Sequence, residues 1–169
     1  MMLRFSAFFA VAAVFFCIVC PTRAQVPAKI TEIQARAFES RTGTFSANLI
    51  GAGAQELGNM PAGKNASVST FIIVKVEFGK GSPVPSAAKV RLVATESGSA
   101  PFSSNAKDQR KRIILDSSSL LGPADTDGTT YVGFWLKRTD CRTVVLNASL
   151  TGIAGTSSMV ETLPFTCYE

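Results

Sequence analysis

The chain has no histidine among its 169 residues. This absence excludes Ser-His-Asp and Cys-His catalytic arrangements and zinc sites built on imidazole, and it removes the usual general base near neutral pH. Carboxylate chemistry stays open, because the chain has 12 acidic residues. They are scattered singly, and no pair is marked out for glycosidase-type hydrolysis, which needs two carboxyl groups roughly 5 to 9.5 Å apart. The sequence therefore predicts no catalytic residue and no cofactor.

Long apolar runs are also scarce, and the only long one lies near the N-terminus. Residues 5–20 are almost purely apolar, follow the basic Arg4 and precede the small residue Ala24. A basic start, an apolar centre and a small residue at the end are typical of a secretory signal peptide. The run is shorter than the roughly 20 residues that a membrane helix needs. We expect a cleaved signal peptide over residues 1–24 and a secreted or periplasmic product with no membrane span, forming a single domain over residues 25–169.

Cysteine is the next scarce residue. Of the four cysteines, Cys17 and Cys20 lie within the predicted signal peptide, which leaves Cys141 and Cys167. Two cysteines in an oxidising compartment allow a single intrachain pair, so the sequence predicts one disulfide. Closing a loop of this length would stabilise the fold by roughly 3.5 kcal/mol in the chain-entropy model. Two free buried thiols are the alternative.

The charge balance is only mildly basic. Removal of Arg4 and Arg23 lowers the number of basic residues from 17 to 15 against 12 acids, so the net charge falls from +5 to +3. This excess does not by itself indicate nucleic acid, and no aromatic residues are interleaved with the basic ones, so we expect no nucleic-acid partner. The single basic cluster comprises Lys107, Arg110, Lys111 and Arg112. It is either a patch for an acidic partner or anionic envelope surface, or a solvated loop and strand end that discourages aggregation.

Helix signals are nearly absent after residue 24, whereas segments that alternate apolar and polar residues recur between Gly, Pro, Ser and Asn. The predicted strands are 29–38, 44–50, 68–78, 88–96, 110–116, 130–137, 142–150 and 159–168. Because no crossover helices lie between them, a parallel βαβ arrangement is excluded. The pattern predicts an all-β fold, an antiparallel β-sandwich of immunoglobulin-like type with about seven or eight strands.

The strongest strand candidate is 68–78. Its even-numbered residues form one face that is apolar apart from Thr70, and Phe71 and Ile73 make part of the other face apolar too, which predicts a central or covered strand. Three polar or glycine-rich segments are predicted to be loops: 51–65, 97–108 and 117–129.

Residues 131–136 concentrate aromatic side chains, with Tyr131, Gly133 and Trp135 on one face of the predicted strand. A glycine inside a strand indicates a bulge or a large neighbour passing over it. We expect the Tyr131–Trp135 face to be buried. If it is exposed, it becomes a binding surface for a sugar or a protein.

Two kinds of short motif are further candidate sites. Asp125 and Asp127 stand before Gly128, and such an alternation can wrap carboxylate and carbonyl oxygens around Ca²⁺, although Asp-Gly is also a common hairpin turn. Asn65 and Asn147 each begin an Asn-Ala-Ser tripeptide, which is a glycosylation acceptor in a eukaryotic host.

Taken together, these features predict an exported, non-catalytic binding or structural module that recognises a protein or envelope partner, for instance as an inhibitor or immunity-type protein. Loops at the ends of a sandwich are natural recognition elements. Two alternatives stay open: a carboxylate-based hydrolase acting on polysaccharide, and a Ca²⁺-dependent carbohydrate-binding or adhesion module. The sequence leaves strand order, partner identity and oligomeric state undetermined.

Overall fold

The computed structural model describes residues 27–39, 42–51, 57–58, 69–97, 111–137, 142–153 and 155–166. Within these ranges the chain forms strands and no helix, so the all-β prediction is confirmed. None of the described segments is a helix long and apolar enough to cross a membrane.

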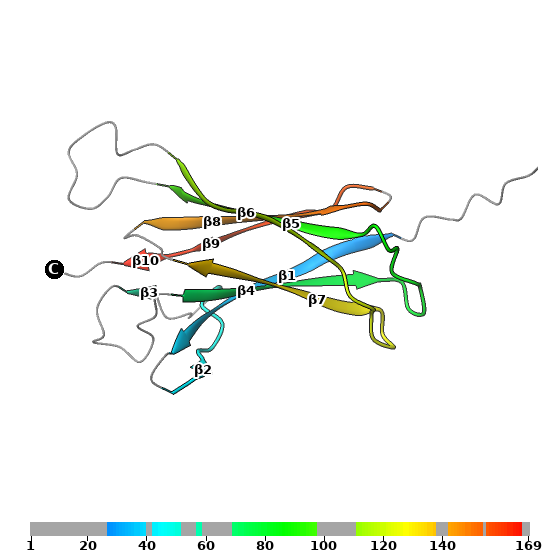
Figure 1. Cartoon of the computed structure of the whole chain (residues 1–169), viewed down its shortest axis with the longest axis horizontal. Helices are drawn as coiled ribbons and strands as arrows, with labels where there is room; N and C mark the ends of the chain where they lie inside the picture. Colours follow the sequence, from blue (N-terminus) through cyan, green and yellow to red (C-terminus); the bar gives the residue numbers. More distant parts are fainter. Residues whose placement is uncertain are drawn as a thin grey trace, which may run out of the picture.

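Eight strands form two antiparallel sheets that lie as separate layers (Figure 1). The first sheet has the order β2-β1-β4-β7 and the second has the order β6-β5-β8-β9. The strands of the first sheet are β1 (Ala28–Glu39), β2 (Thr44–Phe45), β4 (Ser69–Phe78) and β7 (Thr129–Lys137). The strands of the second are β5 (Lys89–Ser97), β6 (Arg112–Leu120), β8 (Thr143–Thr151) and β9 (Ser158–Leu163). A short parallel pair joins β3 (Leu57–Gly58) to β10 (Phe165–Thr166).

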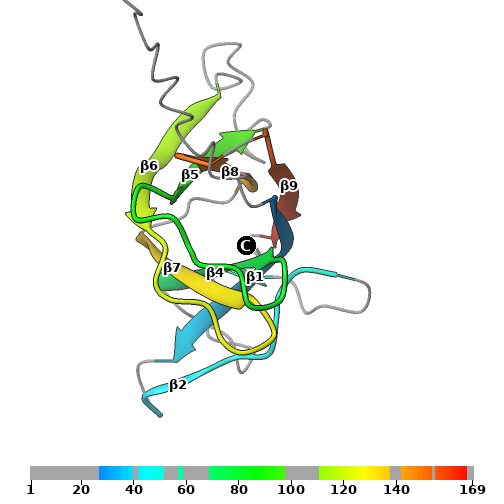
Figure 2. The same ribbon diagram turned by 90° about the vertical axis from the view of Figure 1, so that its right-hand side faces the viewer.

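The hydrophobic core lies between the two sheets, which face each other when viewed end-on (Figure 2). It is built from alternate residues of each strand, because successive side chains of a strand point to opposite faces. Strand β4 pairs with β1 on one side and β7 on the other, which confirms the prediction of a central strand. The fully buried residues of the central strands include Ile72, Val74, Val76, Val90, Leu92, Leu146 and Ala148.

Strand β6 departs from the sequence prediction, which placed a loop from residue 117 onward. The strand continues through Ser117, Ser118 and Ser119 to Leu120. These serines pair along the backbone with β5, where Leu92 lies opposite Ser117. Backbone pairing with a neighbouring strand therefore overrides the weak strand preference of serine.

The predicted strand 44–50 is also shorter than expected. Only Thr44 and Phe45 form a ladder with β1. Beyond them, backbone and side chain both contact β1: the Ser46 N–H donates to the Ala37 carbonyl at 2.9 Å, and Ser46 Oγ accepts a hydrogen bond from the Ala37 amide at 3.0 Å. Asn48 Oδ1 accepts one from the Ala35 amide, also at 3.0 Å. Side-chain oxygens thus accept hydrogen bonds from the β1 amides that the shortened strand leaves without a ladder partner.

Candidate functional site: an exposed aromatic face

Several of the predicted site residues fall outside the part of the chain that the structure describes. They are Cys141, Cys167, Asn65, Lys107 and Arg110. The disulfide, one glycosylation acceptor and half of the basic cluster therefore stay predictions.

The two described members of the basic cluster lie at the start of β6. Lys111 is exposed, and Arg112 donates from Nε to Glu96 Oε2 at 2.9 Å. Glu96 is completely buried, so this ion pair compensates a carboxylate that would otherwise be costly to bury. Glu96 was not among the predicted site residues, although its spacing from Leu92 and Ala94 places it on the same inward face. Arg112 therefore has a structural role, because it neutralises the buried Glu96 carboxylate.

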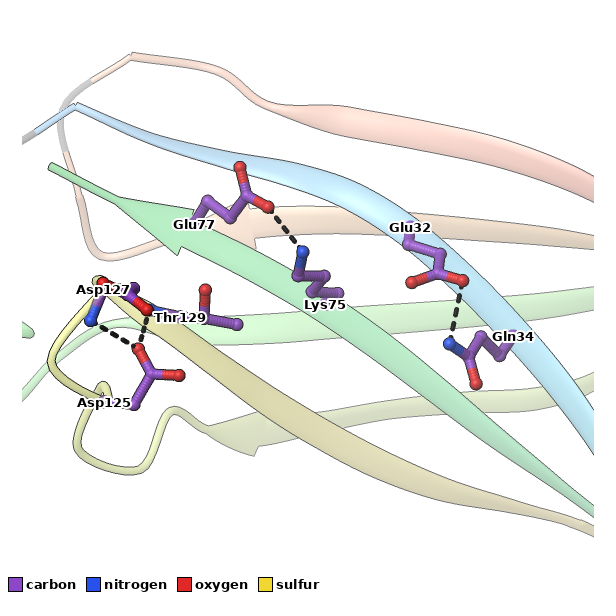
Figure 3. Close-up of polar contacts among 7 residues, drawn as sticks. All are labelled: Glu32, Gln34, Lys75, Glu77, Asp125, Asp127 and Thr129. Atoms are coloured by element: carbon purple, nitrogen blue, oxygen red, sulfur yellow. Dashed lines mark hydrogen bonds and ion pairs between the residues drawn. The ribbon is translucent and has the colours of Figure 1, made fainter. Parts of the chain in front are cut away.

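Asp125 closes the turn that precedes β7. Its Oδ1 accepts the backbone N–H groups of Asp127 at 3.0 Å and Thr129 at 2.8 Å (Figure 3). The carboxylate of Asp127 lies 3.6 Å from Lys80 Nζ in an exposed ion pair. Across the described ranges, no group of three or more His, Cys, Asp or Glu residues is placed to hold a metal ion. The observed geometry is a side-chain-capped turn, and calcium binding stays a prediction.

Asn147 lies on the outer face of the second sheet. It is exposed on β8, opposite Val93 of β5 and Val160 of β9. The side chain is thus accessible, while its glycosylation stays a prediction.

The aromatic face of β7 is exposed, and the expectation that it would be buried is wrong. Tyr131 and Trp135 keep 57% and 45% of their surface accessible. The reason is the layer architecture: Val132, Phe134 and Leu136 fill the core from the opposite face, and no further layer among the described strands covers the outer side.

Four rings gather on this outer face, one from each strand of the first sheet. We call Phe38, Phe45, Phe71 and Trp135 the aromatic cluster. The Trp135 centroid lies 4.9 Å from that of Phe71 and 6.0 Å from those of Phe38 and Phe45. The strand register brings the rings together, since Phe71 lies opposite Trp135 and Phe38 opposite Phe45. Ring pairs at these distances attract one another beyond simple area burial.

Gly133 allows Phe71 to reach across β7. A Cβ atom built at position 133 would lie only 2.2 Å from Phe71 Cζ. The ring therefore occupies the space that a side chain would take, which confirms the predicted large neighbour over this glycine. The missing side chain at Gly133 thus lets the cluster extend over β4 and β7.

A polar network borders the cluster on the same face. Arg36, opposite Phe71 in the register, donates from Nε and Nη2 to Gln34 Oε1 at 3.2 and 3.1 Å. Gln34 in turn donates to Glu32 Oε1 at 2.8 Å (Figure 3). Beside this row, Lys75 Nζ lies 2.6 Å from Glu77 Oε1. Their hydrogen bond raises the pKa of Lys75 and lowers the pKa of Glu77. The outer face is thus aromatic at one end and polar at the other.

A pocket of about 370 Å³ lies apart from the cluster, between the β4–β5 and β6–β7 connections. Its lining includes Pro83, Val84, Leu121 and Pro123, and none of its lining residues is titratable. Its lining therefore offers no titratable acid or base to activate the hydroxyls of Ser82 and Ser86.

Comparison of the sequence with protein-family models gives no match, and comparison with curated proteins gives none either. The exposed aromatic cluster is thus the feature of the described residues that points most directly to a function. The sequence indicated Trp135 as a candidate site residue but did not indicate the other three members of the aromatic cluster. Only the order of the strands shows that the four residues share one face.

Proposed function

We propose that this protein is a non-catalytic binding module, exported to a secreted or periplasmic location, that recognises a protein partner through the aromatic cluster. The observation that carries the proposal is the exposure of the rings, with Trp135 at 45% and Phe45 at 44%. Aromatic area in water is unfavourable, and contiguous patches of it mark interaction sites. Trp and Tyr also dominate the residues that contribute most to protein–protein affinity.

The tilt of the rings favours a protein over a saccharide as the partner. The planes of Trp135 and its three neighbours meet at 36° to 86°. Rings at such angles present edges and hollows rather than a coplanar platform for a flat sugar ring. Irregular apolar side chains of a protein fit hollows of this kind, with the Arg36–Gln34–Glu32 row supplying a polar rim.

The scaffold holds the cluster in place before a partner arrives. Phe71 and Trp135 lie on paired strands, and the backbone beside Phe38 is fixed by the bond from the Ala37 amide to Ser46. Binding therefore orders few additional groups, and less free energy is lost to conformational entropy.

We also propose that the fold is an immunoglobulin-like sandwich and that a disulfide joins Cys141 to Cys167. The order β1-β4-β7 facing β6-β5-β8-β9 supports the classification, because it matches strands A-B-E and C′-C-F-G of such domains. Cys141 precedes β8 in the sequence and Cys167 follows β10. A bond between them would fasten the last strands, which differs from the inter-sheet bond of antibody domains.

The test compares two apolar truncations on opposite sheets. Trp135→Ala removes the centre of the cluster, whereas Ile113→Ala removes a side chain that is 62% exposed on β6. Envelope or secreted proteins of the native host are captured on the wild-type chain, and the affinity of the captured partner for the wild-type chain and for each variant is then measured by calorimetry. We expect Trp135→Ala to weaken binding by about 2 kcal/mol or more and Ile113→Ala to leave it nearly unchanged.

Three results, from this test or from separate assays, would overturn the proposal. Equal loss of binding in both variants would mean that the cluster is not the contact surface. Calcium-dependent retention of an oligosaccharide would favour the carbohydrate-binding alternative. Cleavage of polysaccharide by the purified chain would favour the hydrolase.

A further inference from the structure

Strand β7 lies at one edge of the first sheet, and none of the described strands pairs with its outer side. It pairs with β4 along all nine residues of Ser69–Glu77 without a register shift. The other sheet edges are blunted: β2 has two residues, β6 has a register shift against β5, and β9 has six residues including Glu161. By contrast, Lys137 is the only charged residue of β7, and it stands at the end. A long, regular, apolar edge is a template for pairing with another strand.

The backbone groups on this open side can be assigned. The N–H and the C=O of Thr129 both bond to Asp125, at 2.8 Å each, and so point away from β4. Backbone direction alternates along an antiparallel strand, so Tyr131, Gly133 and Trp135 also direct their N–H and C=O groups outward. No described strand pairs with this side of β7.

We propose that a second copy of this chain pairs with β7 in antiparallel fashion, about a two-fold axis at Gly133. Tyr131 then lies opposite Trp135 of the second copy, and Gly133 lies opposite its own counterpart. All three are residues whose backbone groups face the edge, so each pair exchanges both hydrogen bonds. Aromatic residues directly opposite one another stabilise such pairing further.

Charge complementarity favours a second copy over an unrelated strand. In this register Lys137 lies opposite Thr129 of the second copy, beside the exposed turn that carries Asp125 and Asp127. No like charges stand opposite one another along β7, since Lys137 is its only charged residue. The pairing ends at Thr129 because Asp125 already holds its backbone groups.

The dimer would also join the two aromatic clusters. Phe71 lies over Gly133, which is the residue at the axis, so the Phe71 rings of the two copies approach each other. The two outer faces then form one continuous sheet surface. This inference does not depend on the proposed function, because it concerns the edge of β7 and is read out as a mass.

The experiment is sedimentation equilibrium of the purified chain, in the form its host accumulates, with two substitutions at one position. Tyr131→Pro removes an edge N–H that β4 does not use, whereas Tyr131→Thr removes the same ring and keeps the amide. We expect the wild-type chain to form a concentration-dependent dimer. The dissociation constant of the Tyr131→Pro dimer should be about tenfold or more higher than that of the Tyr131→Thr dimer. A wild-type chain that stays monomeric, or a dimer unaffected by proline, overturns the proposal.

A second measurement keeps the proposal testable if the proline variant does not fold. A nitroxide attached at Lys137→Cys lies four residues from the axis on each strand. The register therefore places the two labelled Cα atoms about 27 Å apart, at roughly 3.4 Å per residue. The wild-type chain, labelled in parallel, controls for the native cysteines. A dimer with a clearly different label separation contradicts the register. A chain that stays monomeric and binds an added foreign peptide strand at β7 contradicts the second copy as the occupant.

Discussion

At the scale of single residues, side chains and their absence decide where the aromatic cluster forms. Gly133 carries no side chain, and Phe71 takes the space above it. Trp135 then packs against Phe71 at 4.9 Å between centroids. The glycine thus makes room for the aromatic cluster although it contributes no ring to it.

We predict that Gly133→Ala displaces the Phe71 ring and destabilises the protein by up to about 1 kcal/mol, because the added methyl takes the space of the ring and weakens its contact with Trp135. The measurement is urea unfolding of a double-mutant cycle with Phe71→Ala. With the ring removed, the same Gly133→Ala change should be nearly neutral, and the two single effects should not add. Additive effects would show that the two residues do not compete for one space. The emission of Trp135, the single tryptophan, reports the ring movement independently.

At the scale of secondary-structure elements, the strands are completed by side chains as well as by ladders. Ser46 and Asn48 satisfy two amides of β1, and Ser157 Oγ accepts a third from Ile30 at 2.9 Å. These contacts hold the outer side of β1 where β2 has already ended.

We predict that Ser46→Ala destabilises the protein by about 1–2 kcal/mol, since it leaves the buried Ala37 amide without its acceptor. Amide hydrogen exchange is the direct measurement: protection at Ala37 should fall while protection in β8 falls only by the global loss. Thr44→Ala, an exposed change one position from Phe45, is the matched control and should have a small effect. Unchanged protection at Ala37 would contradict the role of Ser46.

Elements that carry a period-two apolar pattern were predictable from the sequence. Apolar residues on one face of 68–78, with Phe71 and Ile73 on the other, indicated a central strand, and β4 occupies that place. The serines of β6 carry no such pattern, and only their pairing with β5 makes them a strand. Glu96 is similar, because a charged residue reads as an exposed one until Arg112 is known to lie beside it.

At the scale of the whole molecule, strand order creates the candidate site. Phe71 and Trp135 are far along the chain from each other and from the neighbouring Phe38 and Phe45, and the order β2-β1-β4-β7 places all four on one outer face. Local patterns specify which residues alternate, but not which strands become neighbours. For that reason the sequence indicated an aromatic strand and missed the cluster.

The predicted disulfide also acts on the whole molecule, because it would constrain the unfolded chain between Cys141 and Cys167. We predict that Cys141→Ser lowers the free energy of unfolding by about 2–5 kcal/mol, as the loss of a disulfide does in small exported domains. Thermal unfolding with and without reductant measures it. Reduction should lower the melting temperature of the wild-type chain and leave that of Cys141→Ser unchanged.

The double variant Cys141→Ser/Cys167→Ser distinguishes two causes of destabilisation, which are the loss of a disulfide and the loss of a free thiol. If the disulfide exists, the double variant should be no less stable than Cys141→Ser, because the single change has already broken the bond. Free thiols predict the opposite pattern: two separate effects that add, and no response to reductant. Alkylation of both cysteines in the unreduced, unfolded wild-type chain would establish that second case and remove the covalent link from the fold.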